Sequence, residues 1–150
     1  MKKIFQKTLQ DGDTGLGLLI LRAAGALMML THGIPKLMQL FSGEPIAFAS
    51  VMGLSMGVSL ALAVFSEVVC SVLVLLGLGT RLAAIPLLIT MLTAAFHYHA
   101  ADPFTAREPA LLYGVIFLVI LVMGGGKYSV DSLLSHRLRP VSRRVVRTDG

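Results

Sequence analysis

The chain has 150 residues, of which 55% are hydrophobic and only 14% are charged, and its mean hydropathy is +0.81. A soluble domain of this length needs more polar residues to cover its surface, so the composition indicates one domain with a lipid bilayer as its solvent. The net charge of +5 lies mainly in the two terminal segments, without a recognition motif. We therefore expect these basic residues to orient a membrane protein, and we expect no nucleic-acid partner.

Four apolar segments predict four membrane-spanning helices, at residues 15–41, 57–78, 82–100 and 110–123. The fourth reaches the roughly 20 residues that a span requires if it starts at Phe104 or Arg107. None of the four shows the two-residue alternation of barrel strands. The predicted fold is therefore an all-α, integral membrane four-helix bundle. The connection SGEPIAFASVM is expected to lie along the membrane interface as a short helix.

The distribution of positive charge predicts the orientation. Basic residues precede the first span, mark the turn at Arg81 and crowd the C-terminal tail, whereas the other two loops carry little net charge. With four spans, all three basic segments fall on one side of the membrane. Both termini are therefore expected to be cytoplasmic.

One face of the first span is unusually basic for a membrane helix. Charges at bilayer depth cost about 2.5–3.5 kcal/mol each, so this face should point into the bundle and find partners. Counting along the helices places Arg22 at a depth from which it can reach Glu67 in the second span, which predicts an ion pair. This pair either locks the bundle or forms the polar floor of a ligand cavity. At 100° per residue, the face contains Arg22, Gly25, Met29, His32 and Lys36.

A second group of ionisable residues is expected near the outer ends of the spans. Its members are His32, Lys36, His97, His99 and Glu108. They form either a hydrogen-bonding or proton-exchanging cluster or a set of unrelated interfacial residues. His97 and His99 are two residues apart on a helix and point in different directions, and there is no HExxH motif, so no metal site is expected.

Small and soft side chains indicate close helix packing. The single cysteine, Cys70, excludes an internal disulfide and is expected to be a packing residue. Polar residues also recur on one face of the third span, at Thr90, Thr93 and His97. A stripe in the second span consists of Ser59, Ala63, Ser66, Cys70 and Gly77.

Several stretches together resemble the DoxX family of bacterial four-helix membrane proteins. They are LRAAGALMMLTHGIPKL, SEVVCSVLVLLGLGTRLAA, the pair His97 and Glu108, and GGGKYSVDSLL. The family's last motif has a proline where this chain has Gly125, but Tyr128, Ser129 and Asp131 match, as does Arg81 in the second motif. The resemblance implies a DoxX-like domain at 15–135, between a cytoplasmic segment at 1–14 and a basic cytoplasmic tail at 136–150.

The resemblance also implies a multi-pass protein of the bacterial inner membrane that is often tied to oxidoreductase systems. The small subunit of thiosulfate:quinone oxidoreductase is related to this family. We accordingly expect a non-catalytic accessory subunit rather than an enzyme alone, with an oxidoreductase partner and no covalent cofactor. Quinone is the candidate ligand, with polar groups supplied by Arg22, His32, Glu67 and His97. The alternatives are a transporter that works as a homo-oligomer and a scaffold that recruits a soluble enzyme.

Overall fold

The computed structural model describes residues 11–138, in which all regular structure is helical. Four helical stretches are long and apolar enough to cross a membrane, at Thr14–Phe41, Met56–Leu76, Thr80–Tyr98 and Phe104–Met123. The predicted all-α bundle and its four spans are thus confirmed. The elements are α2 (Asp11–Phe41), α3 (Met56–Val64), the π-helix η1 (Phe65–Cys70), α4 (Ser71–Leu76), α5 (Thr80–Thr93), the π-helix η2 (Ala94–Tyr98), α6 (Phe104–Met123) and α7 (Val130–Leu138).

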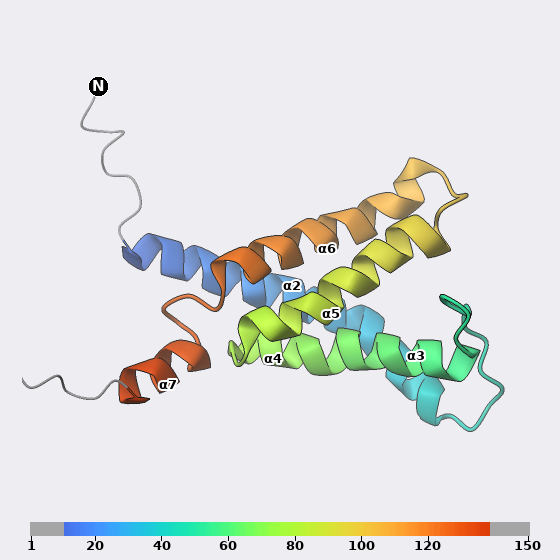
Figure 1. Ribbon diagram of the computed structural model, residues 1–150, viewed down its shortest axis with the longest axis horizontal. Coiled ribbons are helices and arrows are strands. Elements are labelled where there is room, and N and C mark those ends of the chain that lie inside the picture. Colours follow the sequence, from blue (N-terminus) through green and yellow to red (C-terminus); the bar gives the residue numbers. More distant parts are fainter. Residues whose placement is uncertain (1–10, 139–150) are drawn as a thin grey trace, which may run out of the picture.

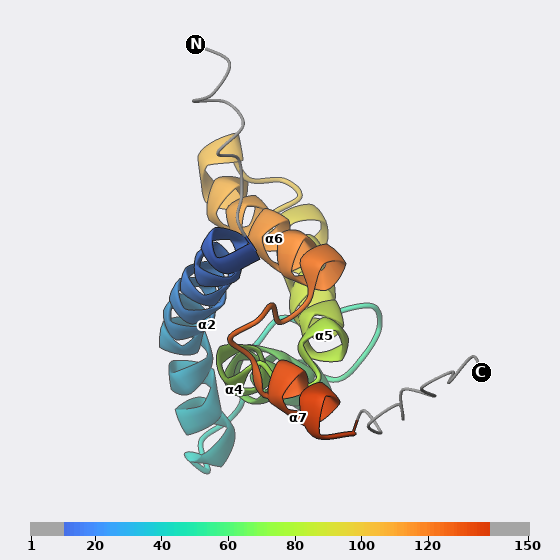
Figure 2. The same cartoon turned by 90° about the vertical axis from the view of Figure 1, so that its left-hand side faces the viewer.

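The four spans form a ring in which each packs against two neighbours. Seen from one end, α2 lies between α4 and α6, and α5 closes the ring between the same two helices (Figure 2). The start of α2, the α4–α5 turn and α7 share this end, which we call the α7 end (Figure 1). Its placement in the cytoplasm stays a prediction. The segments 1–14 and 136–150 fall largely outside the described residues, so the predicted domain boundaries also remain predictions.

The α4–α5 turn is short because two glycines adopt left-handed backbone conformations. Gly77 ends α4 with φ of 73°, and Gly79 precedes α5 with φ of 55°. Side chains with a Cβ rarely adopt these angles, whereas glycine does so without a steric penalty. The chain therefore reverses direction within three residues and returns into the membrane as α5.

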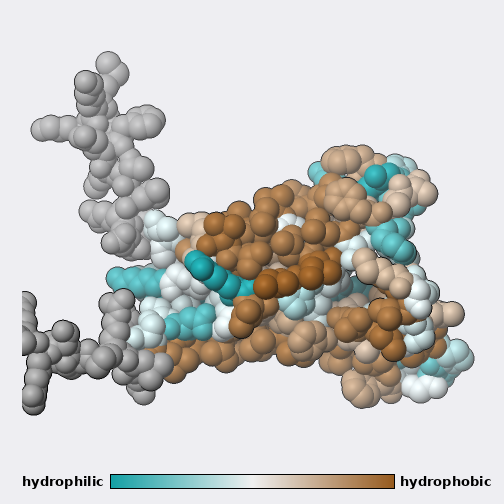
Figure 3. Space-filling model, in the orientation of Figure 1, coloured by the Kyte–Doolittle hydropathy of each residue, from teal (hydrophilic) through white to brown (hydrophobic). Residues whose placement is uncertain are grey.

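The main hydrophobic core lies in the half of the bundle nearest the α7 end. Buried apolar residues from all four spans meet there, and the stripe of small residues predicted in the second span is indeed buried. The core consists of Ala26, Met29, Cys70, Val74, Ala83, Ala84, Leu87, Met91, Phe117 and Ile120. Outside this core, hydrophobic side chains cover most of the flank in view, as expected for a surface that faces lipid (Figure 3).

The helices diverge toward the opposite end, which we call the loop end. There α5 and α6 rise away from α2 and α3, with the connection 42–55 lying between the two pairs (Figure 1). The burial of the basic face of α2 decreases in the same direction, because Arg22 and Met29 are buried whereas His32 is exposed. The prediction of a short helix within this connection is wrong, because the segment contains no helix. Gly43 and Gly53 adopt positive φ, which an α-helix does not accommodate.

Candidate functional site

Arg22 is buried at the α7 end and is surrounded by backbone carbonyl groups. Only 1% of its surface is exposed. Its Nε donates to the carbonyl of Val74 at 2.9 Å and its Nη2 to that of Leu75 at 3.1 Å, while Nη1 donates to the carbonyls of Tyr128, at 3.2 Å, and Gly125. Two of these acceptors lie in the last turn of α4, where the helix dipole favours a cation. Arg22 therefore ties the first two spans to the loop that follows the fourth.

The predicted ion pair between Arg22 and Glu67 is wrong. Its prediction assumed that the first and second spans begin and end at the same level. In the structure α2 starts earlier and places Arg22 beside Val74 in the last turn of the second span. Glu67 lies seven residues before Val74, about 10 Å farther along the helix, and pairs with Lys36 instead.

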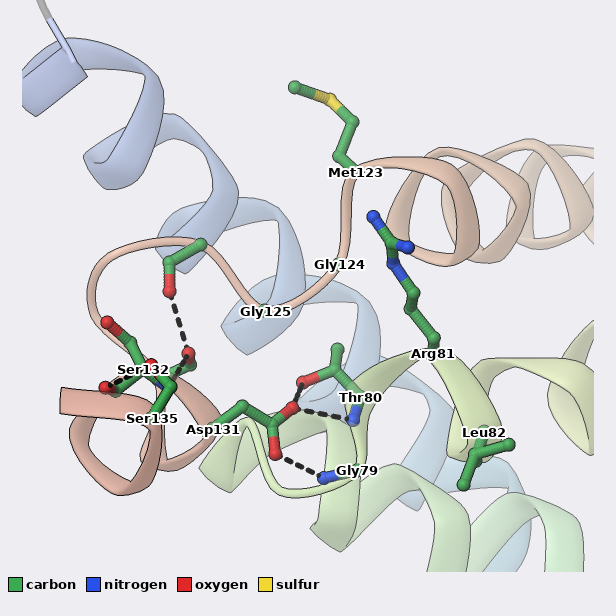
Figure 4. Close-up of a pocket in the computed structure, with 12 residues that line it drawn as sticks. Gly79, Thr80, Arg81, Leu82, Met123, Gly124, Gly125, Asp131, Ser132 and Ser135 are labelled. Carbon is green, nitrogen blue, oxygen red and sulfur yellow. Dashed lines mark hydrogen bonds between the residues drawn. The ribbon is translucent and has the colours of Figure 1, made fainter. Parts of the chain in front are cut away.

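Asp131 completes the α7 end by capping α5. Its carboxylate accepts hydrogen bonds from the Gly79 N–H at 2.7 Å, the Thr80 N–H at 3.0 Å and the Thr80 hydroxyl at 2.9 Å (Figure 4). Burial acts to raise the pKa of Asp131, but these hydrogen bonds and the charge of Arg22 outweigh it and hold the pKa below its ordinary value. The cap residue of α5, Gly79, has no side chain, so Asp131 takes the role of a capping side chain from a distant helix.

The other residues of the predicted structural motif lie at the same end. Arg81 donates from Nη2 to the Val122 carbonyl at 3.1 Å, and the Ser129 hydroxyl donates to the Gly126 carbonyl at 2.7 Å. Tyr128 contributes its carbonyl to Arg22, while its ring is exposed. The DoxX-like motif residues therefore hold together the ends of helices.

The close approach of these segments requires glycine at two positions. A Cβ on Gly77 would lie 2.5 Å from Nη2 of Arg22, and a Cβ on Gly125 would lie 2.7 Å from the Thr80 hydroxyl. Both distances are shorter than van der Waals contact. The packing around Arg22 thus leaves no space for a side chain at either position.

Lys36 and Glu67 form an ion pair within the membrane-spanning region. The Lys36 Nζ lies 2.5 Å and 2.7 Å from the two carboxylate oxygens of Glu67. Glu67 is 2% exposed, whereas the Lys36 side chain is 29% exposed. The π-helix η1 carries Glu67, and such turns occur often at functional sites. Gly33 permits the contact, because a Cβ there would lie 2.9 Å from the Cβ of Glu67.

Aromatic residues lie on both sides of Lys36 along α2. The ring centroid of Phe48, in the connection 42–55, lies 6.0 Å from the Lys36 ammonium. One turn before Lys36, His32 meets Tyr113 of α6 edge-on, with 5.8 Å between ring centroids. Tyr113 in turn stacks on Phe117 at 6.4 Å. These contacts connect α2 to α6 where the two helices begin to separate.

A groove of about 310 Å³ runs along the second half of α5. Its wall is one helical face, and Met52 from the connection 42–55 lines the other side. Met52 has a positive φ of 52°, a conformation that is uncommon for residues other than glycine and that occurs at ligand sites. Thr93 and His97 are the polar residues of the lining. The full lining is Met52, Ile89, Leu92, Thr93, Phe96 and His97.

The structure does not bring the five ionisable residues expected at the outer ends into one cluster. His32 contacts Tyr113, Lys36 contacts Glu67 and His97 lines the groove. His99 instead meets Asp102, with Nδ1 and Oδ2 2.6 Å apart, and Glu108 is exposed. Within residues 11–138, no three His, Cys, Asp or Glu side chains are arranged so that they could hold a metal ion.

Several residues of these sites were not identified from the sequence. Met52 and Phe48 lie in a connection whose sequence has no periodic pattern, so nothing indicated which helix they would contact. Gly33 did carry a signal, because a glycine beside the basic face of α2 marks a close approach of another helix. The capping role of Asp131 depends on a contact 52 residues away in the chain.

Comparisons with known proteins identify related bacterial proteins, one of which is described as a membrane protein. A model of the DoxX family matches residues 17–100. An uncharacterized protein of Haemophilus influenzae is 33% identical over 122 residues, which cover 77% of this chain and 88% of that protein. An uncharacterized membrane protein of Mycobacterium tuberculosis is 41% identical over 87 residues, covering 47% of this chain and 52% of that protein. No solved structure matches the chain.

Proposed function

Because the chain belongs to the DoxX family of membrane proteins, we propose that it is a non-catalytic subunit of a quinone-linked oxidoreductase in the bacterial inner membrane. The observation that carries this proposal is the groove along α5. A quinone needs apolar surfaces for its flat ring and hydrogen-bonding groups for its carbonyl oxygens. The groove offers Ile89 and Leu92 for the first requirement, and Thr93 and His97 for the second.

The dimensions and location of the groove suit a lipid-soluble ligand. Its volume of about 310 Å³ is at the lower end of the range for small-molecule sites, which are mostly apolar with a few placed polar groups. It lies on the outer face of the span Thr80–Tyr98, where Phe96 is 64% exposed. A quinone would therefore enter sideways from the bilayer, and its isoprenoid tail would remain among the lipid chains.

The proposal assigns electron transfer to a partner protein. A bound quinone accepts electrons together with protons. The chain itself has one cysteine and no nucleotide-binding fingerprint, so its residues bind and orient the quinone rather than reduce it. Among the residues of the groove, Thr93 and His97 are the two whose side chains can hydrogen-bond a quinone carbonyl.

Co-purification tests this function directly. The tagged chain would be extracted from its native membranes in a mild detergent, and its bound proteins and quinones would be identified by mass spectrometry. We expect a stoichiometric oxidoreductase partner and retained quinone. The variants His97→Phe and Thr93→Val should retain less quinone than the wild type. The matched control is His99→Phe, which changes an imidazole that contacts Asp102 outside the groove. A homo-oligomer with neither partner nor quinone would contradict the proposal.

A transporter that works as a homo-oligomer is the second candidate, and the Lys36–Glu67 pair favours it. Buried charge pairs within membrane spans often mark ion or substrate pathways. In vesicles, such a protein would support substrate or proton flux that Glu67→Gln abolishes. Flux by the purified chain without any partner would favour this function over the redox subunit.

A further inference from the structure

A hollow of about 620 Å³ opens at the α7 end, apart from the groove and the Lys36–Glu67 pair. It lies between the α4–α5 turn, the 124–126 loop and the first two turns of α7 (Figure 4). Its lining is polar in a particular way. The lining contains one cation, Arg81, and four residues with a hydroxyl group, which are Thr80, Ser129, Ser132 and Ser135.

Arg81 is held in position but keeps donors for a ligand. Its Nη2 donates to the Val122 carbonyl at 3.1 Å, and its Nε would lie 3.1 Å from a Cβ on Gly124. The guanidinium therefore lies beside the end of α6. A guanidinium has five N–H donors, arranged in a fork that fits two oxygens of a phosphate.

The one carboxylate of the lining, Asp131, is occupied by contacts within the protein. Both of its oxygens accept hydrogen bonds from Gly79 and Thr80 at the start of α5. Arg22 is buried behind the 124–126 loop, and Lys127 follows that loop directly. The charge of Arg22 acts on Asp131 from behind the loop, which leaves Arg81 as the cation of the described lining that faces a ligand, so an anion is favoured.

The location of Arg81 identifies what kind of anion this is. Arg81 stands at the end of one candidate span and Val122 at the end of another. Leu82, the next residue in the chain, is 75% exposed, and Val122, whose carbonyl accepts a hydrogen bond from the guanidinium, is 67% exposed. A phospholipid presents the same sequence of groups, with a phosphate directly above its acyl chains. We propose that this hollow binds the phosphate of an anionic phospholipid, with Arg81 as its main ligand and the acyl chains along Leu82 and Val122.

Native mass spectrometry of the full chain tests this site. The protein would be released from vesicles with equal amounts of phosphatidylglycerol and phosphatidylcholine that carry the same acyl chains. We expect phosphatidylglycerol to be retained preferentially, and Arg81→Gln to lower its retention about fivefold. Arg107→Gln is the matched control, because Arg107 contacts loop carbonyls at the loop end. Equal retention by wild type and Arg81→Gln would overturn the proposal.

A second pair of variants covers the case in which Arg81→Gln does not fold. Ser132→Glu places a negative charge in the hollow, while an acid in the first turn of α7 is favourable for the helix itself. We expect Ser132→Glu to lose phosphatidylglycerol and Ser132→Gln to retain it. If inorganic phosphate binds the lipid-free protein and displaces phosphatidylglycerol at equal concentration, the site is one for a soluble anion, and the assignment to a lipid is wrong.

Discussion

Two basic residues of α2, Arg22 and Lys36, have different kinds of partner. Arg22, at the α7 end, donates only to backbone carbonyls and is fully buried. Lys36, toward the loop end, pairs with the carboxylate of Glu67 and is partly exposed. A peptide carbonyl neither takes up a proton nor leaves its position, whereas a carboxylate side chain can do both. The α7 end is therefore held by backbone groups whose positions are fixed, whereas the contact toward the loop end joins two side chains that can move apart.

The same contrast appears in the packing. The main core lies in the half where the four spans are close together, and the glycines at 77 and 125 bring helix ends into contact there. In the other half, α5 and α6 separate from α2 and α3 (Figure 1). The groove beside His97 lies on the outer face of α5. Rigid packing at one end allows the other end to remain open.

Replacement of Arg22 should have the largest effect on this contrast. Arg22→Ala leaves four carbonyl groups without their charged donor, and we expect the free energy of unfolding to fall by about 4 kcal/mol or more. Cys70, the single cysteine, is 2% exposed, so labelling by a thiol-reactive dye during denaturant titration in micelles reports the opening of the core. Arg107→Ala serves as the control. If the free energy of unfolding falls no more than in Lys36→Met, the α7 end is not the more firmly held of the two ends.

Separation of the Lys36–Glu67 pair should have an intermediate effect. Lys36→Met leaves a buried acid without its counter-ion, and we expect a loss of about 2–3 kcal/mol in the same assay. The double variant Lys36→Met with Glu67→Met should regain most of this loss, because neither charge then remains in the bundle. If the double variant is less stable than either single variant, the pair is a structural lock equivalent to Arg22, and the contrast between the two ends fails.

The smallest effect is expected for Asp131→Asn, which weakens the cap on α5 by about 1 kcal/mol. Because the pKa of Asp131 is lowered in the folded protein, its stabilising contribution is present above the ordinary aspartate pKa of about 3.9 and is lost as the pH falls through the lower folded value. The difference in melting temperature between wild type and Asp131→Asn should be constant from neutral pH down to that range and shrink below it. A difference that grows on acidification would show that the cap does not depend on the carboxylate charge.

The sequence predicted the spans well because each is a long apolar segment with clear ends. The inward face of α2 near Arg22, and the buried stripe from Ser59 to Gly77, also followed from helical periodicity. The pairing of charges did not follow, because periodicity fixes the direction of a side chain but not the relative height of two helices. Because α2 lies at a different height along α4 than expected, the partner of Glu67 is Lys36 and not Arg22.

The groove illustrates a second limit of the sequence. Thr93 and His97 were predicted to share one face of the third span, and both line the groove. Thr90, expected on the same face, is not part of its lining. Met52 completes the groove from an irregular connection, where no repeating pattern indicates which helix a side chain will contact.

The contacts of Arg22 also have a consequence for the order of events during synthesis. Arg22 belongs to the first span, yet its partners Gly125 and Tyr128 follow it by 103 and 106 residues. A chain that enters the membrane from its N-terminus carries this guanidinium into the bilayer long before the last loop has been made. Its partners are present only after the loop that follows the fourth span has been made. Until then the guanidinium is without these carbonyl groups, so this is the interval in which a membrane insertase or chaperone would protect the chain most.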